Sequence, residues 1–186
     1  MSKLYILVGV PASGKSTISK HLISESCTVY STDAIRCELF GDEKLTYTDE
    51  WLKKNGYNGS DDHLEKYDYA NITIYKMFFE RISKSLNEGL DVIADATNIS
   101  KYSRSRLIKA CGENASEIHA IVIATPLDTC ITQNIARGEK LTEKALRWIA
   151  DDYEEPTPDE GFDSIRFIGD KNSIDYGIKY NKQNNK

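Results

Sequence analysis

No stretch of this 186-residue chain is a long hydrophobic run. The first segment, SKLYILVGV, carries a short apolar run that soon meets a proline and a glycine. Such a run is too short for a membrane span and for the apolar core of a signal peptide. We therefore expect neither a membrane span nor a signal peptide.

Cysteine is scarce, and the chain lacks an excess of positive charge. The four cysteines are scattered, with no C-x-x-C pair and no histidine nearby at metal-ligand spacing: Cys27, Cys37, Cys111 and Cys130. This pattern indicates reduced thiols in a cytoplasmic protein. The net charge of −5 and the pI of about 5.3 argue against coating of a nucleic acid duplex, but leave a local basic site open.

The chain also lacks internal repeats and any linker that would divide it. Its length suits one α/β domain, and its 40% hydrophobic and 28% charged residues are typical of a soluble globular protein. We predict one domain over residues 1–175. The polar residues 176–186, which end in YNKQNNK, have the composition of a frayed tail.

Short apolar runs alternate with longer segments of helical period, which is typical of a parallel sheet with crossover helices. We predict strands at 4–8, 27–31, 90–95, 118–124 and 164–169. We predict helices near 15–26, 33–40, 62–88, 101–111, 127–136 and 143–153. Residues 41–61 are predicted to be a polar loop with short helical pieces.

The segment GVPASGKS, residues 9–16, matches the phosphate-binding P-loop pattern and lies between a predicted strand and a predicted helix. Its two glycines allow a tight turn that aims backbone N–H groups at phosphate oxygens. Lys15 can then reach the β- and γ-phosphates, and the Ser16 hydroxyl can bind Mg²⁺. We predict a P-loop NTPase-type α/β fold with a helical lid, and ATP and Mg²⁺ as cofactors. The predicted nucleotide contacts are Gly9, Ala12, Ser13, Gly14, Lys15, Ser16 and Thr17.

The acceptor of a phosphate must be bound at the same sheet edge, beyond the carboxyl ends of the strands. Asp33 follows the second strand there, where it is a candidate general base for a hydroxyl; alternatively it is an ordinary first-turn aspartate. Arg36 lies one helical turn later and is either a clamp for an acceptor phosphate or a solvated arginine. Asp95 ends the third strand, which suggests a water-mediated Mg²⁺ contact or an orienting partner for Arg36.

Cations gather in two further places. Residues 101–109 hold Lys101, Arg104, Arg106 and Lys109, which either favour an anionic acceptor or form a solvated basic face. Arg137 precedes Gly138 after a predicted helix, so it is either a lid arginine over the γ-phosphate, with the lid at about 137–145, or a cation near a helix end. Residues 151–163 carry seven acids and no base, and we expect a solvated connection there.

Together these segments resemble the kinase module of polynucleotide 5′-hydroxyl kinases of the bacteriophage type. The resemblance rests on GVPASGKST, STDAIR, DATN, the ARG lid and YEEPTPDEGFDSI. It implies transfer of the ATP γ-phosphate to a 5′-OH end of DNA or RNA, with catalytic roles for Lys15, Asp33 and Arg137. The implied substrate-binding residues are Arg36, Asp95, Thr97, Asn98 and Arg104.

The pattern departs from the family at Gln133, where relatives often carry a second lid arginine, and Ala96 competes with Asp95 for the family's aspartate. A kinase of a small metabolite or nucleoside is the alternative on the same scaffold. A nucleotide-binding switch is a third hypothesis, and Asp33 counts against it. The resemblance implies nucleic acid 5′-OH ends as substrate, and it leaves open a homo-oligomer or repair partner proteins.

Overall fold

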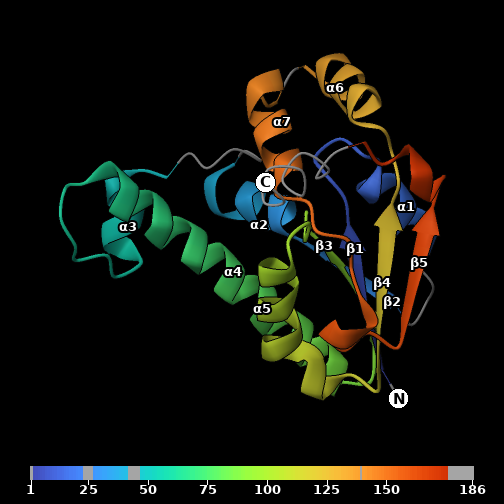
Figure 1. Ribbon diagram of the computed structural model, residues 1–186. Helices are drawn as coiled ribbons and strands as arrows, with labels where there is room; N and C mark the ends of the chain where they lie inside the picture. Colours follow the sequence, from blue (N-terminus) through green and yellow to red (C-terminus); the bar gives the residue numbers. More distant parts are fainter. Residues whose placement is uncertain (1, 23–26, 42–46, 139, 176–186) are drawn as a thin grey trace, which may run out of the picture.

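A sheet of five parallel strands forms the centre of the computed structural model, which describes residues 2–22, 27–41, 47–138 and 140–175. The strands stand in the order β2-β3-β1-β4-β5 (Figure 1). Each lies within one residue of its predicted range: β1 (Lys3–Val8), β2 (Cys27–Ser31), β3 (Asp91–Asp95), β4 (Glu117–Ile123) and β5 (Ser164–Ile168). The predicted α/β fold class is confirmed.

The helices also follow the apolar periodicity of the sequence. They are α1 (Lys15–Leu22), α2 (Thr32–Phe40), α3 (Asp49–Lys54), α4 (His63–Asn87), α5 (Lys101–Cys111), α6 (Leu127–Ala136) and α7 (Glu143–Asp151). Short 3₁₀ helices add η1 (Gly112–Asn114), η2 (Pro158–Glu160) and η3 (Lys171–Ser173). The predicted end of the first helix at 23–26 and the predicted tail at 176–186 lie outside the described residues, as do 42–46 and 139.

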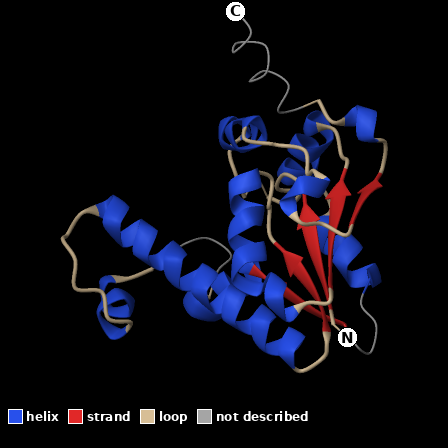
Figure 2. Cartoon of the chain, turned by 60° about the horizontal axis from the view of Figure 1, so that its bottom comes forward, coloured by secondary structure: helices blue, strands red, loops and turns tan. Residues whose placement is uncertain are grey.

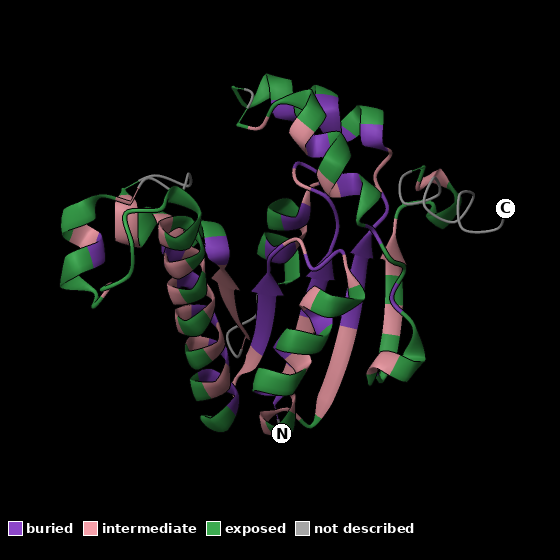
Figure 3. Cartoon of the chain, turned by 60° about the vertical axis from the view of Figure 1, so that its left-hand side comes forward, coloured by how far each residue is buried: buried purple, intermediate pink, exposed green. Residues whose placement is uncertain are grey.

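Apolar side chains on both faces of the sheet explain why it is buried. The larger cluster joins β1, β3 and β4 to α4, α5, α6 and α7, and includes Leu4, Ile6 and Phe78 at 0% exposure. A smaller cluster on the other face lies under α1 and includes Leu7 and Ile93. Figure 3 shows that the central strands are largely buried. A strand that is buried on both faces has a continuous apolar sequence.

All five strands run in one direction, so their carboxyl ends share one edge of the sheet (Figures 1 and 2). The loops after β1, β2, β3 and β4 leave at this edge, and α6 and α7 stand beyond it. Parallel α/β sheets bind ligands at this edge. The topology therefore gathers the predicted site residues, which are up to 128 positions apart in sequence, from Gly9 to Arg137.

An arm made of α3 and the first half of α4 extends away from the sheet (Figure 1). Lys66 Nζ of α4 donates to Asp49 Oδ1 of α3 at 2.8 Å, and the rings of Tyr57 and Tyr69 lie 5.1 Å apart. These contacts hold α3 against α4. Among the described residues, none of the helices has the length and apolar content that crossing a membrane requires.

Candidate active site

The P-loop connects β1 to α1 by a turn that needs two left-handed residues, Ala12 with φ 64° and Gly14 with φ 99°. Gly14 tolerates this conformation without strain because it has no Cβ. At Gly9 the restriction is space, since a Cβ there would lie 2.7 Å from Ser13 Oγ. Ser13 Oγ is buried and has no hydrogen-bond partner in the part of the chain that the structure describes. The two glycines of the motif are thus explained by different causes, backbone strain at one and crowding at the other.

Lys15 is the charged centre of the loop. Its ammonium group donates to the carbonyl oxygens of Gly9 and Val10, both at 2.8 Å, and the residue is only 8% exposed. Burial lowers the pKa of Lys15 to about 8, while the negative charges of Asp95 and Asp33 oppose this effect. The loop therefore holds a cation that water solvates poorly, which favours a phosphate oxygen as its next partner.

Asp95 lies beside the P-loop at the end of β3 and is 6% exposed. Burial raises the pKa of Asp95, and the positive charge of Lys15 and a hydrogen bond from Ser16 act in the opposite direction. Ser16 itself is exposed. The structure thus pairs Asp95 with the Ser16 hydroxyl, whereas Arg36, its alternative predicted partner, pairs with Asp33.

Asp33 lies in the first turn of α2, directly after β2, and Arg36 follows one helical turn later. Ser31 caps this helix, since its side chain accepts hydrogen bonds from the backbone N–H groups of Asp33 and Ala34. Arg36 Nη1 lies 2.5 Å from Asp33 Oδ1, and the Asp33 side chain remains 60% exposed. The charge of Asp33 also acts on both Lys15 and Asp95. An accessible carboxylate therefore stands close to the P-loop.

The loop after β3 holds the P-loop in place through Thr97 and Asn98. The Thr97 carbonyl accepts a hydrogen bond from Gly9 N at 3.0 Å, and the Asn98 amide donates to Leu7 O at 2.9 Å. Asn98 is 4% exposed and has a left-handed φ of 45°. The Asn98 amide thus binds the backbone of β1 and is not directed at a substrate. The structure therefore shows a structural role for Asn98. Thr97 is half-buried.

Arg104 corrects the prediction of a substrate-binding arginine. Its guanidinium is 0% exposed and forms two 2.7 Å hydrogen bonds to the carboxylate of Glu160. It also donates to the carbonyls of Asn98, Ile99 and Glu154 at 2.9–3.1 Å. Because these bonds use the donors of a fully buried group, Arg104 cannot reach a substrate. It instead fixes the loop after β3.

The acidic segment, residues 151–163, was predicted to be a solvated connection, but several of its carboxylates bind α5. Its Glu160 neutralises Arg104, and its Asp159 lies 2.8 Å from Lys101 Nζ. Glu154 accepts a hydrogen bond from the Lys101 backbone N–H at 2.7 Å. Two of the four cations of the basic segment therefore already have carboxylate partners inside the chain.

Arg137 follows α6 as its C-cap and is exposed. It is close enough to Lys15 that its charge contributes, after the larger effect of burial, to the lowered Lys15 pKa. Past Gly138, the Leu141 backbone exchanges hydrogen bonds at 2.6 and 3.3 Å with the side-chain amide of the buried Asn134. The predicted lid arginine thus projects from a segment that is anchored on both sides of Gly138.

Sequence reasoning did not identify Thr125 and Asn134. The Thr125 hydroxyl donates to the Ser13 carbonyl at 2.8 Å and so connects the end of β4 to the P-loop. Its position directly after an apolar strand at the ligand edge is the signal that could have found it. Asn134 gave no such signal, because a polar residue within an amphipathic helix is normally exposed.

The polar groups of the P-loop, together with Asp95, fit a nucleoside triphosphate with Mg²⁺. The left-handed turn, the buried cation of Lys15 and the Ser13 Oγ, which has no hydrogen-bond partner among the described residues, suit the binding of an anion. Within the described residues, no group of three or more His, Cys, Asp or Glu side chains could hold a metal ion. Mg²⁺ suits this site because it is commonly bound by one or two protein oxygens together with phosphates, and Ser16 and Asp95 supply such oxygens. Exposed Thr17 flanks Ser16, and buried Ala12 shapes the turn.

Known proteins share this architecture. The chain is 25% identical over 159 residues to the L-seryl-tRNA(Sec) kinase of Methanococcus maripaludis, which covers 82% of this chain and 53% of that protein. The Pnkp1/Rnl/Hen1 RNA repair complex contains a similar fold with a TM-score of 0.59, at 24% identity over 78% of this chain and 42% of that one. A second structure of the Pnkp1/Rnl/Hen1 complex gives 26% identity and a TM-score of 0.52 over 70% and 38% of the two chains.

Kti12 of Chaetomium thermophilum, solved in complex with ADP-AlF3, has the same fold along almost its whole length, with a TM-score of 0.61 at 14% identity, over 97% of this chain and 96% of that one. The chain spans about half or less of the length of the curated relatives that it matches. The AAA_33 family, described as an AAA domain, matches residues 4–156. This chain therefore belongs to the AAA_33 family, whose match includes the P-loop and four of the five strands.

Proposed function

We propose that this chain is a Mg²⁺-dependent kinase that transfers the γ-phosphate of ATP to the 5′-hydroxyl end of DNA or RNA. The observation that carries the proposal is the Asp33–Arg36 pair, a 60% exposed carboxylate near the P-loop with a cation 2.5 Å away. A kinase that acts on a hydroxyl needs a carboxylate in this place, and a nucleotide switch does not.

In the proposed reaction Asp33 orients the 5′-hydroxyl and accepts its proton while the hydroxyl oxygen attacks the γ-phosphorus. The bond from that phosphorus to the bridging oxygen breaks, and ADP leaves. Lys15 and the backbone N–H groups of the P-loop hold the β- and γ-phosphates, and Arg137 stabilises the charge that develops on the transferred group. Ser16 and Asp95 would hold Mg²⁺, which would supply further neutralisation of phosphate charge.

Arg36 is proposed to contact a phosphate of the acceptor next to the reacting nucleoside. Its guanidinium suits this role because it pairs with Asp33 through Nη1, which leaves other N–H donors of the same group for a phosphate. A polynucleotide offers such a phosphate beside its 5′-end, and a free nucleoside or sugar does not. The similarity to an L-seryl-tRNA(Sec) kinase and to Pnkp1 structures supports a nucleic acid acceptor.

Transfer from γ-labelled ATP tests the proposal directly. Wild-type protein is incubated with Mg²⁺ and 5′-OH oligonucleotides, with nucleosides and sugars in parallel. We expect label on the oligonucleotides, and a loss of kcat of at least about a hundredfold in Asp33→Asn, since general-base catalysis contributes about 10²–10⁴-fold.

The matched control is Asp49→Asn, which changes another first-turn aspartate with a cationic partner, Lys66, on the distant arm. It should keep wild-type transfer. Label that appears only on a nucleoside or sugar would establish the small-metabolite alternative, and ATP hydrolysis without transfer would establish the switch.

A further inference from the structure

Three tyrosines and one arginine form a cation–aromatic strip along one flank of α4 and the start of α5: Tyr67, Tyr75, Tyr102 and Arg106. The Arg106 guanidinium lies over the ring of Tyr75 at 5.3 Å and over the ring of Tyr102 at 5.8 Å. Tyr102 is 70% exposed and Tyr67 is 44% exposed. Large aromatic surfaces are thus left in solvent on both helices.

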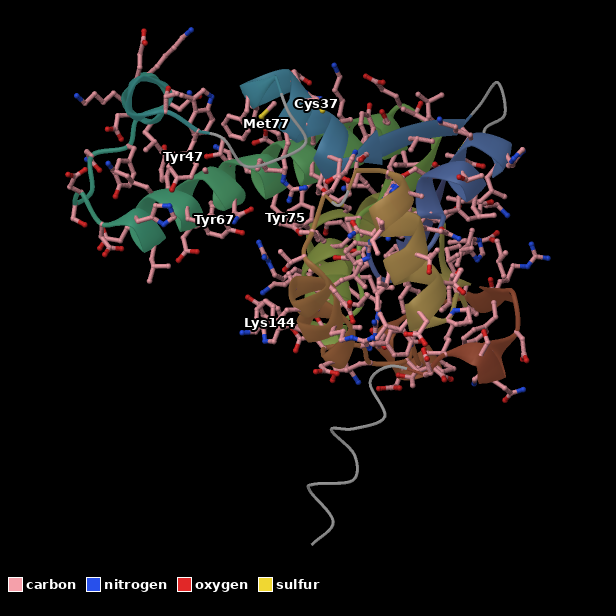
Figure 4. The ribbon with its side chains drawn as sticks, turned by 90° about the horizontal axis from the view of Figure 1, so that it is seen from above. Cys37, Tyr47, Tyr67, Tyr75, Met77 and Lys144 are labelled. Carbon is pink, nitrogen blue, oxygen red and sulfur yellow. The ribbon has the colours of Figure 1, made fainter. Side chains whose placement is uncertain are left out.

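The strip lies near the edge of the sheet that carries the P-loop. Tyr102 is the second residue of α5, the helix that follows Asp95 and the loop after β3. Helix α4 also packs against α2, where Arg81 forms two hydrogen bonds to Glu38 at 2.7 and 2.8 Å. Figure 4 shows Tyr67 and Tyr75 along the flank of α4 that faces the side of Lys144 on α7. Helix α4 therefore carries part of the strip and also packs against α2, the helix that carries Asp33 and Arg36.

Arg106 differs from the two cations that precede it on α5. Lys101 and Arg104 have carboxylate partners in the acidic segment. Across the described ranges, Arg106 has no carboxylate within 4.0 Å, and its contacts are with aromatic rings. Its positive charge is therefore available to an anion, next to an exposed ring that can stack on a flat group.

We propose that this strip binds the acceptor as a single strand, with bases stacked on Tyr102 and its neighbours and a backbone phosphate beside Arg106. Aromatic rings that alternate with cations bind single strands because every unpaired base has a face to stack and every linkage has a charge. A duplex keeps its bases paired and stacked on one another, so exposed rings select the single strand. This inference rests on the proposed function and extends it to nucleotides beyond the reacting one.

Binding and transfer are measured separately with single-stranded 5′-OH oligonucleotides of six to eight bases, a blunt duplex of the same sequence, and a nucleoside 3′-monophosphate. Binding is followed by fluorescence anisotropy of a label at the 3′-end, and by competition for the unlabelled monophosphate. We expect Tyr102→Ala and Arg106→Gln each to weaken oligonucleotide binding about tenfold. The affinity for the monophosphate and the KM for ATP should not change, because neither ligand reaches the strip.

Tyr102→Phe keeps the ring and should retain wild-type affinity. Leu64→Ala removes an equally exposed apolar side chain from the arm and controls for general loss of apolar surface. Equal losses for monophosphate and oligonucleotide, no loss in Tyr102→Ala, or equal wild-type affinity for duplex and single strand would each overturn the inference. If oligonucleotides bind through the strip but no 5′-OH is phosphorylated, the proposed function fails, and the strip is a single-strand binding surface whose ligand is not a phosphate acceptor.

Discussion

Lys15 holds a positive charge at a position that water barely reaches, since the residue is 8% exposed. Burial lowers its pKa to about 8, and the charges of Asp95 and Asp33 limit the effect. The lysine therefore costs folding free energy while it is charged, and the same lack of solvent strengthens its attraction for a phosphate. At the scale of single residues, the site exchanges stability for affinity.

The stability of the nucleotide-free protein should accordingly depend on pH through Lys15. Between pH 8 and 10.5 the unfolded lysine keeps its proton and the folded one loses it, so stability rises with pH in this window. Across this whole window the free energy of unfolding should rise by an amount on the order of 3 kcal/mol. Urea unfolding of wild type and Lys15→Met across pH 7–10.5 measures it. As pH rises, the free energy of unfolding of the wild type should increase relative to that of Lys15→Met.

The comparison of the wild type with Lys15→Met is needed because other groups titrate in the same pH range. Burial raises the pKa of the Cys130 thiol to about 11, and this destabilises the folded state as pH rises above the pKa of the unfolded thiol. Cys130 is present in both proteins and largely cancels. A pH-independent difference between wild type and Lys15→Met would show that Lys15 keeps its proton throughout.

Helix α5 and the acidic segment around η2 act together as one unit at the scale of elements. Arg104 and Glu160, which are both at most 2% exposed at the side chain, join them by two parallel hydrogen bonds. The same guanidinium holds the Asn98 carbonyl, and the Thr97 carbonyl holds the P-loop through Gly9 N. The Arg104–Glu160 ion pair thus supports the P-loop through the loop after β3.

Removing one partner of this pair should destabilise the fold strongly. We expect Glu160→Gln to lower the free energy of unfolding by about 3 kcal/mol, because a fully buried guanidinium loses its counter-charge. The neighbouring pair provides the control: Asp159→Asn breaks a solvent-exposed contact with Lys101 and should change stability little. Thermal and urea unfolding of the two variants would contradict this view if their losses were similar.

The site is a property of the whole molecule, because four strand ends contribute to it. The P-loop follows β1, Asp33 follows β2, Asp95 ends β3, and Thr125 follows β4. A nucleotide bound across these ends connects segments that are distant in the sequence. Its binding free energy therefore adds to the stability of the entire fold.

Addition of ATP and Mg²⁺ should raise the melting temperature by roughly 5–10 °C at a hundredfold excess over Kd. ATP with EDTA should give a smaller rise. Asp95→Asn should remove most of the difference between the two conditions, whereas Asp91→Asn, at the opposite end of the same strand, should preserve it. Differential scanning fluorimetry measures both variants. Retention of the Mg²⁺ increment in Asp95→Asn would exclude Asp95 from the metal site.

By itself the sequence determined the strands, most of the helices and the P-loop, because each depends on neighbouring residues. An apolar run, a helical period or an eight-residue motif is complete within its own segment. The proximity of Asp33 and Arg36 was predictable for the same reason, since they are three residues apart on one helix.

Only the tertiary structure decided which charges remain available to a ligand. Arg104 and Arg106 look equivalent in the sequence, yet Glu160, 56 positions away, buries and neutralises the first, while the second lies exposed over aromatic rings. The sequence predicts a solvated connection at residues 151–163, whereas in the fold Asp159 and Glu160 of this segment pair with Lys101 and Arg104 of α5. The physical reason is that a charge is satisfied by whatever the fold places within a few ångströms of it, and that partner has no fixed distance along the chain.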